Sequence, residues 1–233
     1  MKFNMYVLID EFPDNDEVEL CIFTRPKYPV QYRDQWNKDV KFACSPSAIN
    51  VFWLLGIKET FPIEENYNVN GQKFRVRCIE YDSFGSYMLI IQCVDEMNEM
   101  ILYTGQFTTF SSALRNSLAN YLENKFSDMY IDNKLAFTGH TNSLKSACNS
   151  VQYYLRKYEG YRVYLDLEDL FGYEELLINL AQERKIKIRL HKLQMAIMRH
   201  GNNLQYFDFE GNPDLKVFYR PERNNWNLEH YER

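Results

Sequence analysis

The segment formed by residues 161–190 constrains the fold most, because its hydrophobic periodicity changes twice. Residues 163–167 alternate between apolar and polar, as in a strand, and apolar residues in 174–180 repeat as on one face of a helix. Residues 186–190 alternate again. A strand, a helix and a strand over this length predict a parallel β–α–β unit.

Two further patterns occupy the middle of the chain. Residues 74–107 contain three strand-like runs separated by polar turns, which predicts an antiparallel meander whose middle strand is covered on both faces. From Phe110 to Phe126 an apolar residue recurs at every fourth position, which predicts a helix docked on that meander. A second helix is predicted after residue 142, with these residues on its apolar face: Leu144, Cys148, Val151, Leu155 and Tyr158.

The two ends of the chain also contain strand-like runs. Residues 3–9 and 18–24 predict two strands, and the acidic segment 10–17 between them is typical of a turn that joins an antiparallel pair. The runs 204–210 and 215–220 flank Gly-Asn-Pro-Asp, which is a β-hairpin signal.

Together these patterns predict an α+β protein. It would contain an antiparallel β meander packed with amphipathic helices, followed by a C-terminal βαβ-like unit and a β-hairpin. The pattern changes near residue 110, so the chain divides into a β-rich portion, residues 1–110, and an α/β portion, residues 111–233. Because no Gly/Ser-rich linker separates the two, we expect one cooperative body.

Composition limits the class of protein. The formal net charge is −5, which argues against broad, non-specific wrapping of nucleic acid but leaves room for a local basic site. The first residues lack the pattern of a secretory signal, and no apolar segment is long enough to span a bilayer. The five cysteines are widely spaced and form no CxxC pair, as expected of reduced thiols. We expect a cytoplasmic protein without membrane association.

Acidic residues at the end of the first strand of the β–α–β unit form the first candidate site. Asp166, Glu168 and Asp169 lie where ligands bind in open α/β sheets, and if they have a catalytic role, Asp166 and Glu168 are the pair that would hold Mg²⁺. The alternative is structural, because acidic residues are also favoured at helix N-termini, where they cap amides and oppose the helix dipole.

A basic run that follows forms the second candidate site. Lys185, Lys187, Arg189 and His191 project to one side of a strand in this pattern, and no acidic residue occurs from residue 184 to residue 207. This stripe is suited to phosphate, a nucleotide or an acidic partner surface. Charged residues also protect edge strands from aggregation, so the alternative that the basic run only protects an edge strand stays open.

The sequence supports two functions from different classes. No Walker loop, GxGxxG, HExxH, GxSxG or CxxC motif is present, whereas aromatics make up 16% of residues, including 18 tyrosines. We therefore expect a binding or inhibitor-type protein that recognises a macromolecular partner through an aromatic-rich surface of uneven charge. The favoured partner is another protein. We expect a bacterial or phage protein that needs no cofactor. The alternative is a Mg²⁺-dependent enzyme acting on a phosphodiester or nucleotide, in which strands 161–167 and 186–190 are parallel neighbours and bring both candidate sites together. Whether the protein is an enzyme stays open.

Overall fold

The computed structural model of the protein describes residues 3–4, 6–13, 15–27, 39–81, 84–94, 99–105, 112–122, 126–131, 144–159, 163–167, 171–200, 202–208 and 215–219. The chain forms two compact units, residues 1–139 and 140–233, and both contain helices and strands, as an α+β protein does. The units divide at residue 139, whereas the sequence pattern changes near residue 110. The difference arises because the helix that follows residue 110 packs on the sheet before it.

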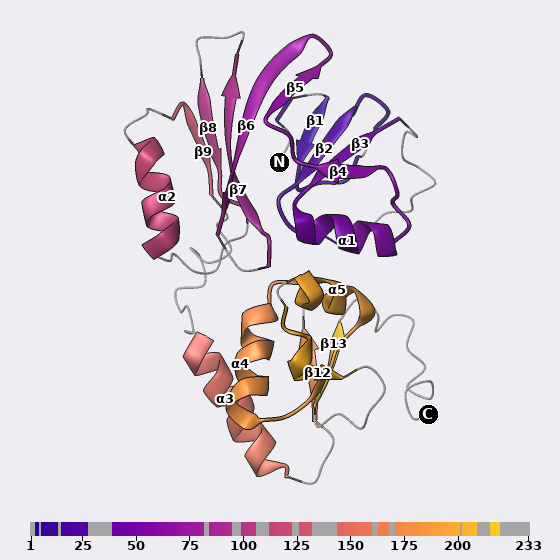
Figure 1. The fold of residues 1–233 in the computed structure, drawn as a ribbon, viewed down its shortest axis with the longest axis vertical. Helices are drawn as coiled ribbons and strands as arrows, with labels where there is room; N and C mark the ends of the chain where they lie inside the picture. The colour runs from indigo at the N-terminus through magenta and orange to yellow at the C-terminus, as the bar shows by residue number, and fades with distance from the viewer. Residues whose placement is uncertain are drawn as a thin grey trace. The chain divides into compact units, whose positions relative to one another are not determined.

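The first unit begins with a parallel sheet in the order β1-β2-β3-β4 (Figure 1). Its strands are β1 (Val7–Ile9), β2 (Leu20–Phe23), β3 (Lys41–Cys44) and β4 (Thr60–Pro62). The antiparallel pair predicted around residues 10–17 is wrong, because Val7 pairs with Leu20 and Ile9 with Ile22 in parallel register. Every residue of β1 and β2 is buried, which is typical of parallel strands covered on both faces.

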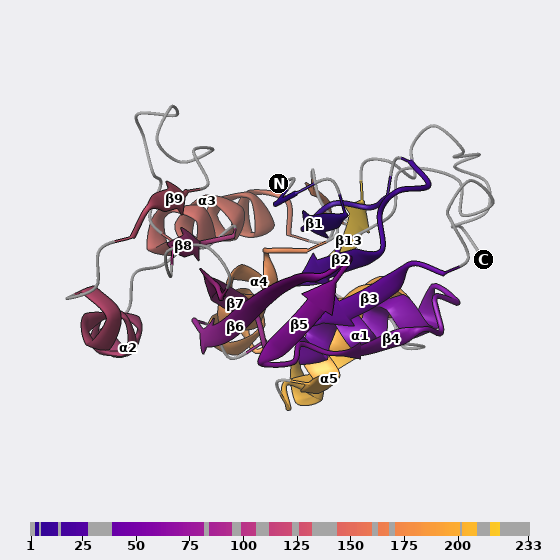
Figure 2. The ribbon, with the colours of Figure 1, turned by 90° about the horizontal axis from the view of Figure 1, so that it is seen from above.

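Helix α1 (Pro46–Leu54) follows β3 and contacts β3 and β4 (Figure 2). Ser45 occupies the N-cap position and Pro46 the first helical position, where a missing backbone N–H costs nothing. The helix buries Val51 and Phe52 and leaves Trp53 and Leu54 exposed at its end.

A five-stranded sheet in the order β5-β6-β7-β8-β9 completes the first unit. Its strands are β5 (Asn66–Val69), β6 (Gln72–Glu80), β7 (Tyr87–Cys93), β8 (Met100–Tyr103) and β9 (Asp128–Tyr130). Neighbours pair antiparallel except β8 and β9, which are parallel. Asn70 and Gly71 both have positive φ, as the two-residue turn between β5 and β6 requires.

Strand β7 is covered on both faces, as its continuous apolar run predicted. On one face, Leu89 and Ile91 join a core that includes buried residues of β1, β2 and β3. On the other face, Met88 and Ile90 contact Leu114 and Leu118 of α2 (Ser112–Leu122). The two sheets and α2 therefore form successive layers of the first unit.

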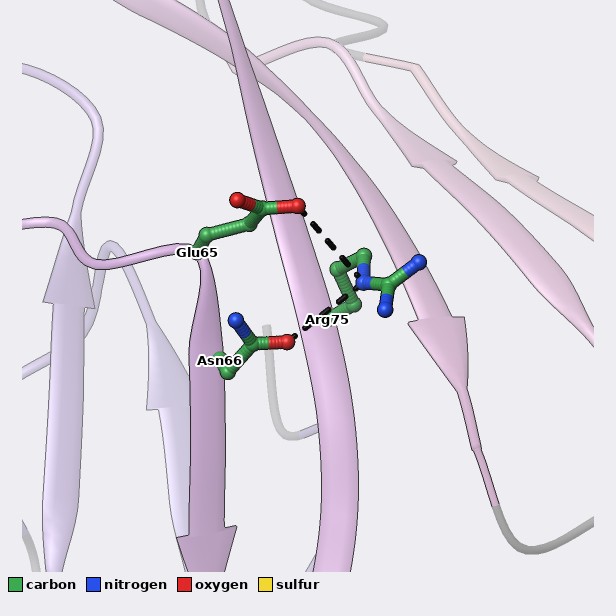
Figure 3. A network of polar contacts seen from close by, with 3 residues as sticks. All are labelled: Glu65, Asn66 and Arg75. Atoms are coloured by element: carbon green, nitrogen blue, oxygen red, sulfur yellow. Dashed lines mark hydrogen bonds and ion pairs between the residues drawn. The ribbon is translucent and has the colours of Figure 1, made fainter.

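The outward side of β6 carries arginines in solvent. Arg75 Nε lies 3.6 Å from Glu65 Oε1 and 3.4 Å from Asn66 Oδ1 of the neighbouring segment (Figure 3). The Arg75 and Glu65 side chains are 41% and 63% exposed, so the pair contributes little to stability. Arg75 thus has the role of a solvated residue on a sheet face.

The second unit contains a parallel sheet in the order β10-β13-β11-β12, of which β12 and β13 are labelled in Figure 1. Its elements are α3 (Leu144–Lys157), β10 (Val163–Leu167), α4 (Glu174–Arg184), β11 (Ile188–Arg189), α5 (Lys192–His200), the 3₁₀ turn Leu204–Tyr206, β12 (Phe207–Asp208) and β13 (Leu215–Tyr219). None of the described helices in either unit is long and apolar enough to cross a bilayer.

The predicted C-terminal hairpin is wrong. β12 and β13 run in the same direction and lie on opposite sides of β11, since Ile188 pairs with both Phe207 and Leu215. This arrangement puts Leu215 between β10 and β11, where it is fully buried. Burial of this strand in the middle of the sheet outweighs the local turn signal.

Candidate functional site

The acidic candidate residues are described only in part. Asp166 lies in β10, paired with Phe218 of β13, while Glu168 and Asp169 lie outside the described residues. In the part of the chain that the structure describes, no three His, Cys, Asp or Glu side chains are placed to share a metal ion. The pairing of Asp166 and Glu168 as metal ligands therefore stays a prediction.

The basic candidate residues lie in three local settings. Lys185 ends α4 in the left-handed conformation, with φ of 53°, and is exposed. Lys187 is exposed and donates a hydrogen bond from Nζ to the carbonyl of Gln205. Arg189, also exposed, lies in β11 at a register position next to Lys216 and Asp208. The three cations therefore remain accessible to solvent on the second unit.

The two candidate sets are not on neighbouring strands. The prediction that strands 161–167 and 186–190 are adjacent is wrong, because β13 lies between β10 and β11. Arg189 pairs with Lys216 of β13, whereas Asp166 pairs with Phe218, two positions farther along the same strand. The β–α–β unit thus has parallel strands with a third strand inserted between them.

His191 forms the N-cap of α5. Its Nδ1 accepts a hydrogen bond of 3.3 Å from the Leu193 amide, and its own amide donates one of 3.2 Å to Gln194 Oε1. This reciprocal pair resembles a capping box, except that the His191 ring accepts from the second helical residue, Leu193, and not from the third. Burial, and secondarily the charge of Lys192, lower the pKa of His191 below its ordinary value, which keeps Nδ1 free to accept.

We predict that His191→Ala lowers the free energy of unfolding by about 1 kcal/mol at pH 8, because the N-cap acceptor is lost. His191→Asn should keep most of the wild-type stability, because asparagine is also a good N-cap acceptor. The pKa of His191 is lower in the folded state, so the unfolded state binds the proton more tightly. The stabilisation by the neutral His191 ring is therefore complete above the pKa of the unfolded state, about 6.5. It is lost as the pH falls from that value through the lower pKa of the folded state.

Urea denaturation of wild type and His191→Asn between pH 5 and pH 8 measures this. The difference in stability between the two proteins should shift toward the variant as pH falls. A difference independent of pH would show that His191 does not cap the helix as a neutral ring.

Burial governs the reactivity of two of the cysteines. None of the five cysteines, all of which lie in the described residues, is in a disulfide, and Cys21, Cys44 and Cys148 are buried. Burial raises the pKa of the Cys44 and Cys148 thiols above the ordinary value, which disfavours the reactive thiolate.

A shallow depression of about 680 Å³ lies in the first unit at the amino ends of the parallel strands. Its rim carries Glu19, Asp39, Glu59 and Glu64 and a single cation, Lys41. Ligands of parallel sheets bind beyond the carboxyl ends of the strands, so this depression lies at the opposite end.

At the carboxyl ends of β1 and β2, the Asp10 carboxylate joins the two sheets of the first unit. Its Oδ1 accepts a 2.8 Å hydrogen bond from the Thr24 amide, and its Oδ2 accepts bonds from Thr24 Oγ1 at 2.5 Å and from the Tyr103 hydroxyl at 3.0 Å. Asp10 has φ of 53°, and Lys27 Nζ donates to its carbonyl. These contacts occupy the carboxylate with structural partners.

The exposed side of α3 carries a cluster of rings and a cation. Tyr153, Tyr154 and Tyr158 are 59%, 54% and 45% exposed. Lys157 Nζ lies 5.9 Å from the Tyr153 ring centroid and 5.4 Å from that of Tyr158. We refer to these four residues as the tyrosine–lysine face.

The opposite side of α3 packs inward, and the helix periodicity explains the division. Cys148 is buried and Val151 and Leu155 are half-buried, as the apolar pattern predicted. The prediction that Tyr158 belongs to the apolar side is wrong, because its side chain is exposed. Tyr158 lies one turn after Tyr154, and the two rings are parallel within 8°. The tyrosine–lysine face was not predicted from the sequence. The signal that could have found it is the number of tyrosines between Tyr153 and Tyr158, which is more than one apolar stripe can bury.

The C-terminal half of α3 lies beside the end of α4 (Figure 1). Arg184 Nη2 donates a 3.1 Å hydrogen bond to the Gln152 carbonyl, and Gln152 Nε2 donates to Glu183 Oε2. The basic run that begins at Arg184 therefore starts next to the residue that precedes Tyr153.

Comparison with known proteins does not assign a family. No protein-family model matches the chain, and no curated protein sequence matches it. A crystal structure of a protein of unknown function from Enterococcus faecalis V583 is similar, at 10% identity and a TM-score of 0.48. The similarity covers 91% of this chain and 57% of that one, so the chain spans a little over half the length of that protein. The geometry of the described residues therefore carries the functional argument alone.

Proposed function

We propose that the protein is a recognition protein that binds an anionic macromolecular partner through the tyrosine–lysine face of α3. The observation that carries the proposal is the exposure of three tyrosine rings, between 45% and 59%, at the C-terminal end of α3, two of which flank one lysine. Tyrosine supplies large contact area with few rotatable bonds, which is why it is enriched at binding surfaces.

The charges around this face indicate the sign of the partner. Arg156 and Lys157 are exposed on α3, and Lys185 and Lys187 are exposed just beyond the end of α4. Residues 140–233 contain 14 Lys or Arg against 13 Asp or Glu, whereas residues 1–139 contain 13 against 19. The second unit is therefore nearly neutral (+1) whereas the first is acidic (−6), so electrostatic complementarity favours the second unit over the first as the site for a negative partner.

A binding role is preferred to the Mg²⁺-dependent enzyme for a geometric reason. The enzyme hypothesis needs the acidic and basic candidates to converge at one edge of neighbouring strands, and β13 separates β10 from β11. Recognition, including an inhibitor-type role in which the bound partner is blocked, needs only the exposed face. A bacterial or phage origin and a cytoplasmic location remain part of this proposal.

Affinity capture from the cells that encode the protein tests the proposal. The bait is the full chain, compared with a Tyr153→Ser, Tyr154→Ser, Tyr158→Ser variant. A control variant, Trp53→Ser with Leu54→Ser, removes the exposed apolar residues of α1 instead. We expect the α3 variant to recover at least tenfold less co-purifying macromolecule, and the α1 variant to match wild type.

Exposed tyrosines contribute little to stability, so all three baits should melt within a few degrees of each other. Equal recovery by all three baits, or a wild-type bait that elutes alone at low salt, would contradict the proposal.

A further inference from the structure

We infer that the partner of the tyrosine–lysine face is single-stranded nucleic acid, whose bases stack on Tyr153, Tyr154 and Tyr158. This inference rests on the proposed function and names the chemical class of the partner. It combines three observations: the arrangement of the rings, the position of the cations, and the charge distribution of the chain.

The rings are arranged along the helix as a ladder. Tyr154 and Tyr158 are parallel within 8°, with centroids 6.5 Å apart, and Tyr153 meets Tyr154 at 77° with centroids 5.4 Å apart. Residues one turn apart advance about 6 Å along a helix, so the ladder offers successive aromatic surfaces to a linear ligand. Stacking of a base on an aromatic side chain tolerates any base, because every base has a π-face.

The cations are interleaved with the rings. Lys157 lies between Tyr153 and Tyr158, and Arg156 is exposed on the same turn of the helix. The hydrogen bond from Arg184 to the Gln152 carbonyl places the end of α4 one turn before Arg156 of α3. Alternating apolar rings and cations match a polymer in which flat bases alternate with phosphates.

Two other anionic polymers match the face less well. In double-stranded DNA the bases are paired and stacked internally, so only phosphates would meet the face and the rings would have no flat partner. An acidic peptide supplies negative charge but no flat apolar group at each step. The three exposed rings therefore favour the single strand over both.

Fluorescence anisotropy of a labelled 15-nucleotide oligothymidylate with the full-length protein tests this at 50 mM salt. We expect micromolar binding by wild type and binding weaker by about 100-fold or more by the variant with Tyr153→Ala, Tyr154→Ala and Tyr158→Ala, because stacking contributes about fivefold or more per base. Lys157→Gln should weaken binding only about threefold and lower the slope of log affinity against log salt by about 0.7, the value for one phosphate on a single strand. Trp53→Ala, on α1, should leave the affinity unchanged.

The outcomes separate the inference from the proposed function. If a duplex of the same length binds as tightly as the single strand, or if the tyrosine variant binds the single strand like wild type, stacking is overturned. If polyglutamate binds in a tyrosine-dependent manner and the oligonucleotide does not, the partner is an acidic protein and only the nucleic-acid inference fails. If neither polymer binds and capture from cells does not depend on the tyrosines, the proposed function fails as well.

Discussion

Replacing Asp10 with alanine is expected to lower the free energy of unfolding by about 3 kcal/mol, because two costs combine. The first is the loss of a carboxylate that accepts hydrogen bonds from the Thr24 amide, the Thr24 hydroxyl and the Tyr103 hydroxyl. The second is backbone strain, since alanine at φ of 53° costs about 1 kcal/mol that aspartate and asparagine tolerate better. Guanidinium denaturation of the full chain measures the change.

Two controls separate these costs. Asp10→Asn keeps the tolerance for positive φ and one oxygen acceptor, so we expect roughly half the loss. Glu17→Ala removes an exposed carboxylate from the same acidic segment and should stay within about 0.5 kcal/mol of wild type. If Asp10→Ala were as stable as Glu17→Ala, the carboxylate would not join the two sheets.

Phe23→Ala is expected to have a larger effect, about 3–5 kcal/mol, because it removes a buried ring from an aromatic cluster. Phe23 is fully buried, and its ring centroid lies 4.7 Å from that of Phe12 and 4.8 Å from that of Phe52. A cavity at this position would loosen contacts between β2, α1 and the segment after β1. Phe23→Leu fills more of the space and should cost clearly less.

The matched control for this prediction is Trp53→Ala, another aromatic truncation in the first unit. Trp53 is 65% exposed, so its removal should change stability by about 0.5 kcal/mol or less. Equal losses in Phe23→Ala and Trp53→Ala would contradict the position of Phe23 in the core. The same denaturation curves test the expected single cooperative body, which predicts one transition for both units.

The sequence predicted elements whose pattern is local. The apolar repeat that follows residue 110 corresponds to α2, with Leu114 and Leu118 buried against the sheet. The continuous apolar run of β7 predicted burial on both faces, and Glu174 and Glu175 lie in the first turn of α4, where the helix dipole favours them.

Pairing between distant strands could not be read from such patterns. The direction of β2 relative to β1 depends on the route of the chain between Ile9 and Leu20, which the acidic residues there do not specify. In the same way, Gly-Asn-Pro-Asp is compatible with a tight turn, but the sheet places β11 between β12 and β13. Register and strand order follow from burial across the whole sheet, which outweighs turn chemistry.

The candidate site was predicted in part for a similar reason. Lys185, Lys187 and Arg189 form a charge run that is visible in the sequence and exposed in the structure. The tyrosine–lysine face was missed because the apolar stripe was expected to include Tyr158, whereas Tyr158 is exposed together with Tyr153 and Tyr154. Only the packing of Gln152 against the end of α4 shows which side of α3 faces solvent.

Photochemical crosslinking tests most directly whether the tyrosine–lysine face is the binding surface. The measurement uses a single strand that contains 5-iodouracil, irradiated with the full-length protein and mapped by mass spectrometry. We expect crosslinks at Tyr153, Tyr154 or Tyr158 that an excess of unlabelled single strand suppresses. Crosslinks confined to other exposed residues, such as Trp53 on α1 or Tyr130 on β9, would contradict it.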